Sequence, residues 1–489
     1  MRAPNILYLH SHDTGVDIAP YGYEVHTPVL QAFAERGARF TRAFSVAPTC
    51  SPSRAGLLTG RYPHEVGMTG LAHRGFVWDD YRRHLVKWLS SFGYTTALCG
   101  VQHVAPRRTM LGYDEYLDGS DGRDYFGVPG LDPVSYDRAN AQRAAEWISK
   151  RADGSAQDRP ARVAAPQAEP AGSSQVGRPH AEPWFLSVGL LATHRPFPGA
   201  DEVTTAEADR TAYRRSAEEM DRAVGTVLDA VERSGLWEST VVLYTTDHGT
   251  PFPGYKGELR DAGTRVALVL WVPPGVPGAE SAGKTYDQLV SQIDLFPTLL
   301  ELAGEGERRG DAEGAARDGS AQHAVGVSGP ATAAAEPRDA AAPWAARSIV
   351  PLLSGRSPAV RDTVYAESNY HAAYEPARTV RTDRYRLITR PAAGLSRAPA
   401  NVDDCPEKEQ LRSTGRLTED HPLVELYDLT VDPGETINRA EDARYAAVRE
   451  ELERRIADWM HGTCDPLLSG VVEAPPGATV DPVSRWSPS

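Results

Sequence analysis

The chain has few cysteines, no long hydrophobic run and fewer basic than acidic residues, and each of these shortages excludes a class of protein. Its 489 residues hold 52 Lys and Arg against 66 Asp and Glu, so the basic face of a nucleic-acid-binding protein is not expected. Four cysteines, at positions 50, 99, 405 and 464, are too few and too scattered for a disulfide framework. No run reaches the roughly eighteen apolar residues that span a membrane, and the first apolar run, 6–9, is too short for a signal-peptide core. We therefore expect a cytoplasmic protein that binds neither nucleic acid nor membrane.

Two segments differ in composition from the rest of the chain. Residues 151–183 and 304–343 are rich in Ala, Gly, Arg, Glu and Ser and poor in large apolar side chains. Such segments cannot bury enough surface to offset the entropy of ordering them. They are predicted to be flexible surface insertions; a regulatory or partner-binding role is the less favoured alternative.

The body of the chain alternates short apolar runs with helical patterns. Strands are predicted at 6–9, 94–98, 185–191, 241–244 and 266–272, and helices after Thr27-Pro28 and over 214–233. This alternation predicts an α/β fold with a mostly parallel sheet covered by helices. After about residue 345 the pattern changes to short strand-like pieces, such as 379–389, and a final amphipathic helix over 443–461. We predict a catalytic domain over 1–345 and a smaller C-terminal subdomain over 346–489.

Histidine and aspartate follow four of the predicted strands. Because the carboxyl ends of parallel strands meet at one edge of a sheet, their side chains are expected to gather there. A single such histidine is more often a structural residue, but four coincident strand ends favour a divalent metal or an acid–base site. The residues are His12, Asp13, His103, His194, Asp247 and His248.

The segment Cys50-Ser51-Pro52-Ser53-Arg54, followed by Leu58-Thr59-Gly60, is the second candidate site. Pro52 can begin a helix and so place Cys50 at its N-terminus, where the backbone N–H groups favour an anion and lower a thiol pKa. Arg54 adds a planar cation suited to an oxyanion. The alternative is a buried cysteine in front of an ordinary helix.

This segment resembles the signature of the sulfatase family, Cys-x-Pro-x-Arg followed by Leu-Thr-Gly. Other segments fall in the family's order, at 193–196, 247–249, 256–257, 263–266 and 425–429. The residues within these motifs are most similar to those of the sulfamidase, or heparan N-sulfatase, branch of the family. The resemblance implies an alkaline-phosphatase-like fold, with a large mostly parallel sheet flanked by helices and a smaller C-terminal subdomain of a short antiparallel sheet and a terminal helix.

The resemblance also implies a mechanism. In this family a formylglycine-generating enzyme oxidises the motif cysteine to formylglycine, whose hydrate attacks sulfur with one hydroxyl and expels sulfate with the other. By position, Arg54 would hold the formylglycine oxygens, His103 would assist collapse of the hydrate, and His194 and Lys256 would contact sulfate and protonate the leaving group. One divalent metal would lie between His12, Asp13, Asp247 and His248.

Three positions depart from the family pattern. His12 and His248 stand where the family usually has Asp and Asn. Val101 stands where the family usually has a lysine, and Arg107 or Arg108 is a candidate to take over the role of that lysine. Among Ca, Mn, Mg and Zn, imidazole ligands favour a transition-type ion over calcium.

The motifs leave three functions open. The favoured one is hydrolysis of a sulfate ester or N-sulfate of a small, sugar-like substrate. Because Asp-His at the later strand end also occurs in relatives that hydrolyse phosphodiesters and phosphonates, a phosphodiesterase or phosphonate monoester hydrolase is the alternative. His12 and Val101 motivate the third, a non-catalytic relative that binds anionic sugars. No oligomeric state is predicted.

Overall fold

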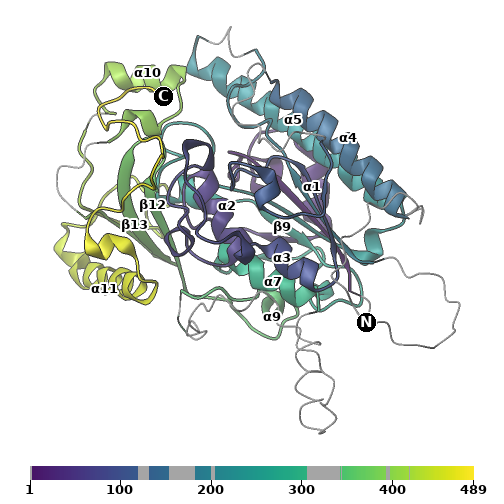
Figure 1. Cartoon of the computed structure of the whole chain (residues 1–489). Coiled ribbons are helices and arrows are strands. Elements are labelled where there is room, and N and C mark those ends of the chain that lie inside the picture. Colours follow the sequence, from purple (N-terminus) through teal and green to yellow (C-terminus); the bar gives the residue numbers. More distant parts are fainter. Residues whose placement is uncertain are drawn as a thin grey trace, which may run out of the picture.

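The computed structural model describes residues 3–118, 131–152, 182–199, 204–304, 342, 344–391, 397–417 and 419–489. Most of the two predicted insertions, 151–183 and 304–343, lies outside these residues. The central feature is an eight-stranded sheet with the strand order β10-β2-β9-β7-β1-β6-β4-β5. Figure 1 shows it between two layers of helices, with the C-terminal part of the chain at one side.

The predicted strands are present in the central sheet, and one of them runs against its neighbours. β1 pairs in parallel with β6 and β7, and β4 pairs in parallel with β6 and β5. β9 is antiparallel to both β7 and β2, so the sheet is mixed. The strands are β1 (Asn5–Ser11), β2 (Ala38–Phe40), β4 (Thr95–Gly100), β5 (Glu115–Tyr116), β6 (Trp184–Gly189), β7 (Thr240–Thr246), β9 (Leu268–Trp271) and β10 (Thr285–Tyr286).

Both faces of the sheet are buried under helices. Because successive side chains of a strand point to opposite faces, Leu7 and Leu9 pack with α1 (Pro28–Arg36), α4 (Pro133–Ala152) and α5 (Ala206–Arg233). Ile6 and Tyr8 pack with the helices of the other layer. These are α2 (Cys50–Thr59), α3 (Leu85–Ser91), α7 (Leu295–Leu302) and α9 (Val350–Leu353).

Helix α5 begins earlier than the apolar spacing predicts. Its first turns are polar, so the periodicity is visible only from about residue 214, but Thr205 caps the helix by accepting a hydrogen bond from the Ala208 N–H. Asp209 lies buried in the first turn and is paired with Arg195, which explains a helical segment without an apolar stripe.

The C-terminal part of the chain forms a four-stranded antiparallel sheet with a terminal helix. The strands β12 (Thr363–Tyr370), β13 (Tyr374–Thr382), β14 (Tyr385–Thr389) and β15 (Val424–Asp428) are adjacent in sequence order. Helix α11 (Ala446–Gly462) buries Leu452, Ile456 and Trp459 against this sheet. The boundary between residues 345 and 346 stays a prediction.

Short elements link the two parts. A three-stranded sheet contains β3 (Ala43–Phe44), β8 (Arg265–Val266) and β11 (Val290–Ser291). Helix α6 (Asp261–Thr264) precedes the C-terminal sheet in sequence, and helix α10 (Pro406–Ser413) lies between β14 and β15. Within the described part of the chain, no helix has the length and apolarity that a membrane span requires.

Candidate functional site

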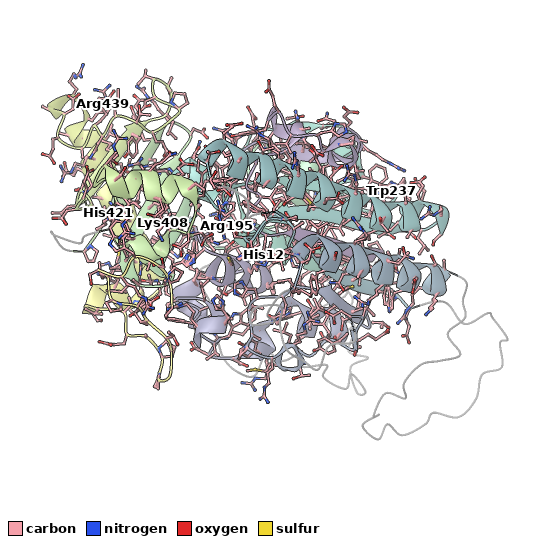
Figure 2. The ribbon with its side chains drawn as sticks, turned by 90° about the horizontal axis from the view of Figure 1, so that it is seen from above. His12, Arg195, Trp237, Lys408, His421 and Arg439 are labelled. Atoms are coloured by element: carbon pink, nitrogen blue, oxygen red, sulfur yellow. The ribbon has the colours of Figure 1, made fainter. Side chains whose placement is uncertain are left out.

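The carboxyl ends of β1 and β7 bring two sequence pairs together. These strands run parallel in register, with Ser11 opposite Thr246, so the residues that follow them meet beyond the sheet edge. The backbone N–H of Asp13, which has a φ of 48°, donates to Asp247 Oδ1 at 2.9 Å. His12, Asp13, Asp247 and His248 are all fully buried. Figure 2 places His12 toward the middle of the molecule.

Cys50 joins this cluster from helix α2, of which it is the first residue. Its Sγ lies 3.2 Å from His248 Nε2 and 3.8 Å from Asp13 Oδ1. Ser53 fixes the helix against the strand end, since its hydroxyl donates to the Asp247 carbonyl at 2.5 Å. Burial raises the pKa of the Cys50 thiol well above its ordinary value, so the depression expected at a helix N-terminus does not occur.

Arg54 lies one turn into the same helix and is directed at a carboxylate. Its Nη2 and Nε contact Asp247 Oδ2 at 3.0 and 3.2 Å, and Nη2 also donates to the Ser11 carbonyl at 2.9 Å. The guanidinium therefore orients Asp247 in addition to any contact with an oxyanion.

Two further predicted residues lie against His12. The His12 ring centroid is 5.5 Å from that of His103 and 5.6 Å from that of His194. His194 Nε2 also lies 3.9 Å from Asp13 Oδ2. Burial lowers the pKa of His12 to about 3 and lowers the pKa of His103 well below its usual range, so both rings are neutral near pH 7.

Lys256 connects the buried cluster to a second carboxylate. Its Nζ lies 2.9 Å from Asp13 Oδ2 and 3.0 Å from Asp403 Oδ2. Burial acts to lower the pKa of this amine, but the charges of Asp13 and Asp403 outweigh it and raise the pKa above its ordinary value. Lys256 is therefore a buried, charged cation.

The donor set fits a divalent cation. Ligand atoms of His12, Asp13, Cys50 and Asp247 all lie within 4.8 Å of one another, and His248 Nε2 is 3.2 Å from Asp13 Oδ1. Lys256 and Arg54 offset the charges of Asp13 and Asp247, so the fit rests on the ligand atoms themselves. A mixture of carboxylate oxygen and imidazole nitrogen suits a transition-type ion better than calcium.

The structure adds three residues that no motif indicated. His73 lies beside His103, with its Nδ1 2.8 Å from His103 Nε2. Asp403 and His371 come from the C-terminal part of the chain, far from the signature in sequence. Only the chain's return past the sheet edge brings them to the cluster.

The predicted replacements for the missing lysine do not reach the cluster. Arg108 is buried and donates to the Gly100 carbonyl at 2.7 Å and to Asp118, while Arg107 is exposed. Val101 is part of the buried core. Lys256 and Arg54 are thus the buried cations that the structure places beside the two strand-end carboxylates among the described residues.

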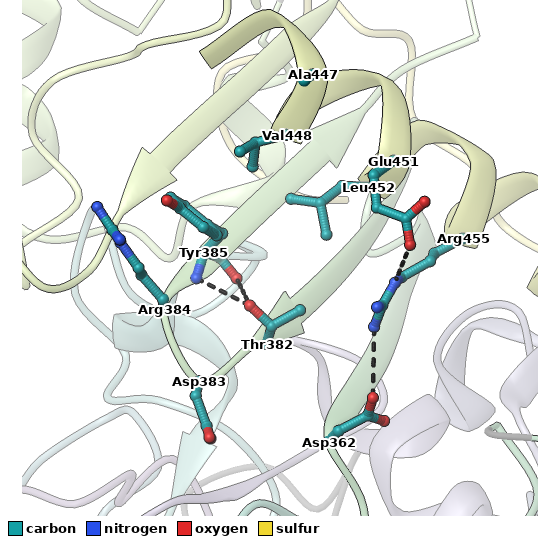
Figure 3. A pocket seen from close by; sticks show the side chains of 10 residues that line it. All are labelled: Asp362, Thr382, Asp383, Arg384, Tyr385, Ala447, Val448, Glu451, Leu452 and Arg455. Carbon is teal, nitrogen blue, oxygen red and sulfur yellow. Dashed lines mark hydrogen bonds and ion pairs between the residues drawn. The ribbon is translucent and has the colours of Figure 1, made fainter. Parts of the chain in front are cut away.

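A separate hollow of about 540 Å³ lies between α11 and the β13–β14 hairpin (Figure 3). Tyr385, Val448 and Leu452 form its apolar floor. Arg455 beside it is held by Glu451 at 2.9 Å and by Asp362 at 3.6 Å. None of the nine predicted site residues lines this hollow, and the strand-end cluster remains the candidate site.

The sheet is mixed and covered on both faces. Acidic residues and histidines lie beyond two adjacent strand ends, and a cysteine begins a packed helix. Together these features define a hydrolase of the alkaline-phosphatase-like fold. The sulfatase family model matches residues 4–305, and the chain belongs to this family.

Named relatives agree with this assignment over nearly the whole chain. An ulvan-active sulfatase of Formosa agariphila is 26% identical over 486 residues, covering 96% of this chain and 83% of the relative. Human N-sulphoglucosamine sulphohydrolase is 27% identical over 530 residues, covering 96% and 93%.

Solved structures share the fold at low identity. A protein solved in complex with its substrate D-glucosamine-2-N,6-O-disulfate has a TM-score of 0.61 at 17% identity and covers 95% of this chain and 99% of its own. The phosphonate monoester hydrolase of Agrobacterium radiobacter has a TM-score of 0.59 at 17% identity, with 95% and 97% covered.

Proposed function

We propose that this protein hydrolyses the sulfate ester or N-sulfate of a small, sugar-like substrate, with position 50 as nucleophile after Cys50 is oxidised to formylglycine. The overall reaction adds water to the S–O or S–N bond and releases sulfate with an alcohol or an amine. The human relative's name, which states an N-sulfated amino sugar, supports the N-sulfate option, and the ulvan-active relative supports a sulfated saccharide.

The observation that carries the proposal is the placement of Cys50. Its side chain begins helix α2 and lies 3.2 Å from His248 Nε2 inside a fully buried cluster. A thiol with a raised pKa is protonated at neutral pH and is a poor nucleophile. A hydroxyl of the formylglycine hydrate is an even weaker acid, and a cation at the adjacent metal position would lower its pKa. Position 50 lies where such a cation would act on it, which supports modification of Cys50.

We assign the metal position to His12, Asp13, Asp247 and His248. A bound divalent cation would neutralise charge on the sulfate oxygens and on the nucleophile. Arg54 would keep Asp247 oriented through its contacts to Oδ2 at 3.0 and 3.2 Å.

The other residues act on the anion and on protons. Lys256, a charged amine within 2.9 Å of Asp13, would bind a sulfate oxygen at the edge of the metal position. His194, whose side chain is 18% exposed, lies on the open side of the cluster, where the leaving group departs. We assign it the proton transfer to that group, and we assign His103 the proton transfer at position 50.

Mass spectrometry of the tryptic peptide 43–54, from protein made in its own host, tests the nucleophile. We expect the mass of an aldehyde in place of the thiol. We also expect Cys50→Ala to lower sulfate release by about 10⁴-fold or more, while Cys464→Ala, at an exposed cysteine, leaves it unchanged. Full activity from protein with an unmodified Cys50 thiol would contradict the proposal.

A phosphodiester or phosphonate substrate is the second candidate. It is favoured by His248, which occupies the position of the family's usual Asn and contacts Cys50. Comparing the rates for a sulfate ester, a sulfamate, a phosphodiester and a phosphonate monoester decides between the two. A higher kcat/KM for either phosphorus compound would replace the first proposal with the second.

A further inference from the structure

Two residues of the C-terminal part lie where the catalytic cluster opens to solvent. Exposure rises along one line of contacts: the Asp13 side chain is 0% exposed, Lys256 is 5% exposed and Asp403 is 20% exposed. His371 lies close enough to Asp403 and Lys256 for their charges to act on it. Its Nδ1 is buried and has no hydrogen-bond partner among the described residues.

A single side chain fixes both residues in place. Asn401 Oδ1 accepts hydrogen bonds from the backbone N–H groups of Ala372 and Ala373, at 2.9 and 2.7 Å, directly after His371. Its Nδ2 donates to Glu375 Oε2 at 2.8 Å. Asn401 thus joins the β12–β13 turn that carries His371 to the loop that carries Asp403.

The loop is also fixed from its other side. Lys408 Nζ donates to the Val402 carbonyl and to Asp404 Oδ1, both at 2.7 Å, and to the Trp486 carbonyl at 2.7 Å. Figure 2 shows Lys408 on the side of Arg195 and His12 that faces the C-terminal part. Asp403 is therefore held in position before any ligand arrives.

The charge of Asp403 is not needed by the cluster itself. Asp13 already lies 2.9 Å from Lys256 Nζ and accounts for a buried ammonium. A further fixed carboxylate beside a site that receives an anion weakens anion binding unless the ligand brings a hydrogen-bond donor to it. A partly exposed acceptor next to an unpartnered imidazole nitrogen suits such a donor.

We propose that Asp403 and His371 form a specificity subsite for a hydroxyl or ammonium group of the substrate's leaving group. This inference rests on the proposed sulfate hydrolysis and names the substrate class: sulfated compounds with a hydrogen-bond donor near the sulfated atom. Asp403 accepts a hydrogen bond from this group, and His371 Nδ1 is the second acceptor.

The test measures kcat/KM for wild type, Asp403→Asn and Asp403→Ala on para-nitrophenyl sulfate, glucosamine N-sulfate, glucosamine 6-O-sulfate and glucose 6-O-sulfate. The aryl ester carries no hydrogen-bond donor, so its loss measures only the effect of residue 403 on Lys256 and is expected to be the smaller one. Loss of a charge-assisted hydrogen bond predicts a decrease of about 10- to 100-fold for at least one sugar sulfate.

The two substitutions distinguish the sources of the donor. An ammonium group loses its ion pair in both variants, whereas a hydroxyl can still donate to the asparagine oxygen and loses its partner only in Asp403→Ala. His371→Ala should show the same selectivity for sugar sulfates. The matched control is Glu409→Gln, a nearby carboxylate that is 64% exposed and contacts Arg412, and it should leave all the ratios unchanged.

Equal losses on the aryl and sugar sulfates would overturn the inference, because Asp403 would then act only by positioning Lys256. The inference would also be overturned if substitution of residue 403 changed kcat/KM for none of the sugar sulfates. If wild type releases sulfate from none of the compounds, the proposed function itself fails, and the inference fails with it. Aryl sulfate turnover therefore distinguishes the two failures.

Discussion

The charged cluster at the strand ends and the one at the interface with the C-terminal sheet differ in how their charges are matched. In the catalytic cluster, the carboxylates of Asp13, Asp247 and Asp403 face the cations Arg54 and Lys256. The interface cluster joins the central sheet region to the C-terminal sheet, and its carboxylates face an equal or larger number of guanidinium groups. It comprises Asp261, Glu425, Glu435, Arg260, Arg381, Arg386 and Arg390.

The histidines increase this difference. Burial lowers the pKa values of His12 and His103, so these rings add no positive charge at neutral pH. The catalytic cluster therefore has a net negative charge of its own, which a bound cation can compensate. The interface cluster is complete without a ligand, and its role is to hold two parts of the chain together. A deficit of positive charge, more than burial or density of charge, distinguishes the candidate site from the interface cluster.

Removing the proposed metal ion should produce the largest effect on the catalytic cluster. Chelation is expected to abolish sulfate release, because Asp13 and Asp247 would then repel the sulfate anion. Elemental analysis of protein purified without added metal should find about one equivalent of a transition-type ion, because two of the four proposed ligands are imidazoles. Stoichiometric calcium alone would contradict this ligand assignment.

Breaking the interface cluster should affect stability more than chemistry. Arg386 contacts Asp261 and lies 2.6 Å from Glu435 Oε1, and its side chain is 1% exposed. Arg386→Leu leaves the buried Glu435 and the half-buried Asp261 without this partner and is expected to lower the free energy of unfolding by about 3–5 kcal/mol. Calorimetry measures the loss. The kcat of the folded fraction should stay near wild type; a loss of kcat with unchanged stability would contradict the structural role.

The buried pair of His64 and Glu367, which belongs to neither cluster, provides the smallest effect and a pH test. Burial acts against the protonated ring, but the Glu367 charge outweighs it and raises the pKa of His64 above 6.5. The pair's contribution to stability is therefore complete below the unfolded-state pKa and is lost as pH rises through the folded-state pKa.

Urea denaturation of wild type and His64→Gln between about pH 6 and about pH 9 checks this sign. The stability difference between the two proteins should shrink as pH rises. An Arg82→Gln control, at an exposed arginine whose partner Asp80 lies two residues away, should give a difference that is flat with pH. A difference that grows with pH would contradict the pairing of His64 with Glu367.

Local sequence signals predicted the positions of β1 and β7 because their cause is local, although each strand runs two residues further than predicted, to Ser11 and Thr246. The apolar runs before His12 and Asp247 become β1 and β7, and the parallel register then brings the four following residues together. The direction of β9 was not predictable in this way, since an apolar run has the same pattern in either orientation. The start of α5 was also missed, because its first turns are stabilised by a cap and an ion pair and carry no apolar stripe.

The sequence by itself determined the family, the α/β alternation and the nine residues proposed for the chemistry, because each is written in a short run of neighbouring residues. Only the tertiary structure decided that Arg54 is directed at Asp247, that Arg108 is turned away to Asp118, and that Asp403 reaches Lys256 from 147 positions along the chain. The charge balance of the site belongs to this second group. It depends on which ionisable groups share a buried volume, and that is set by long-range packing.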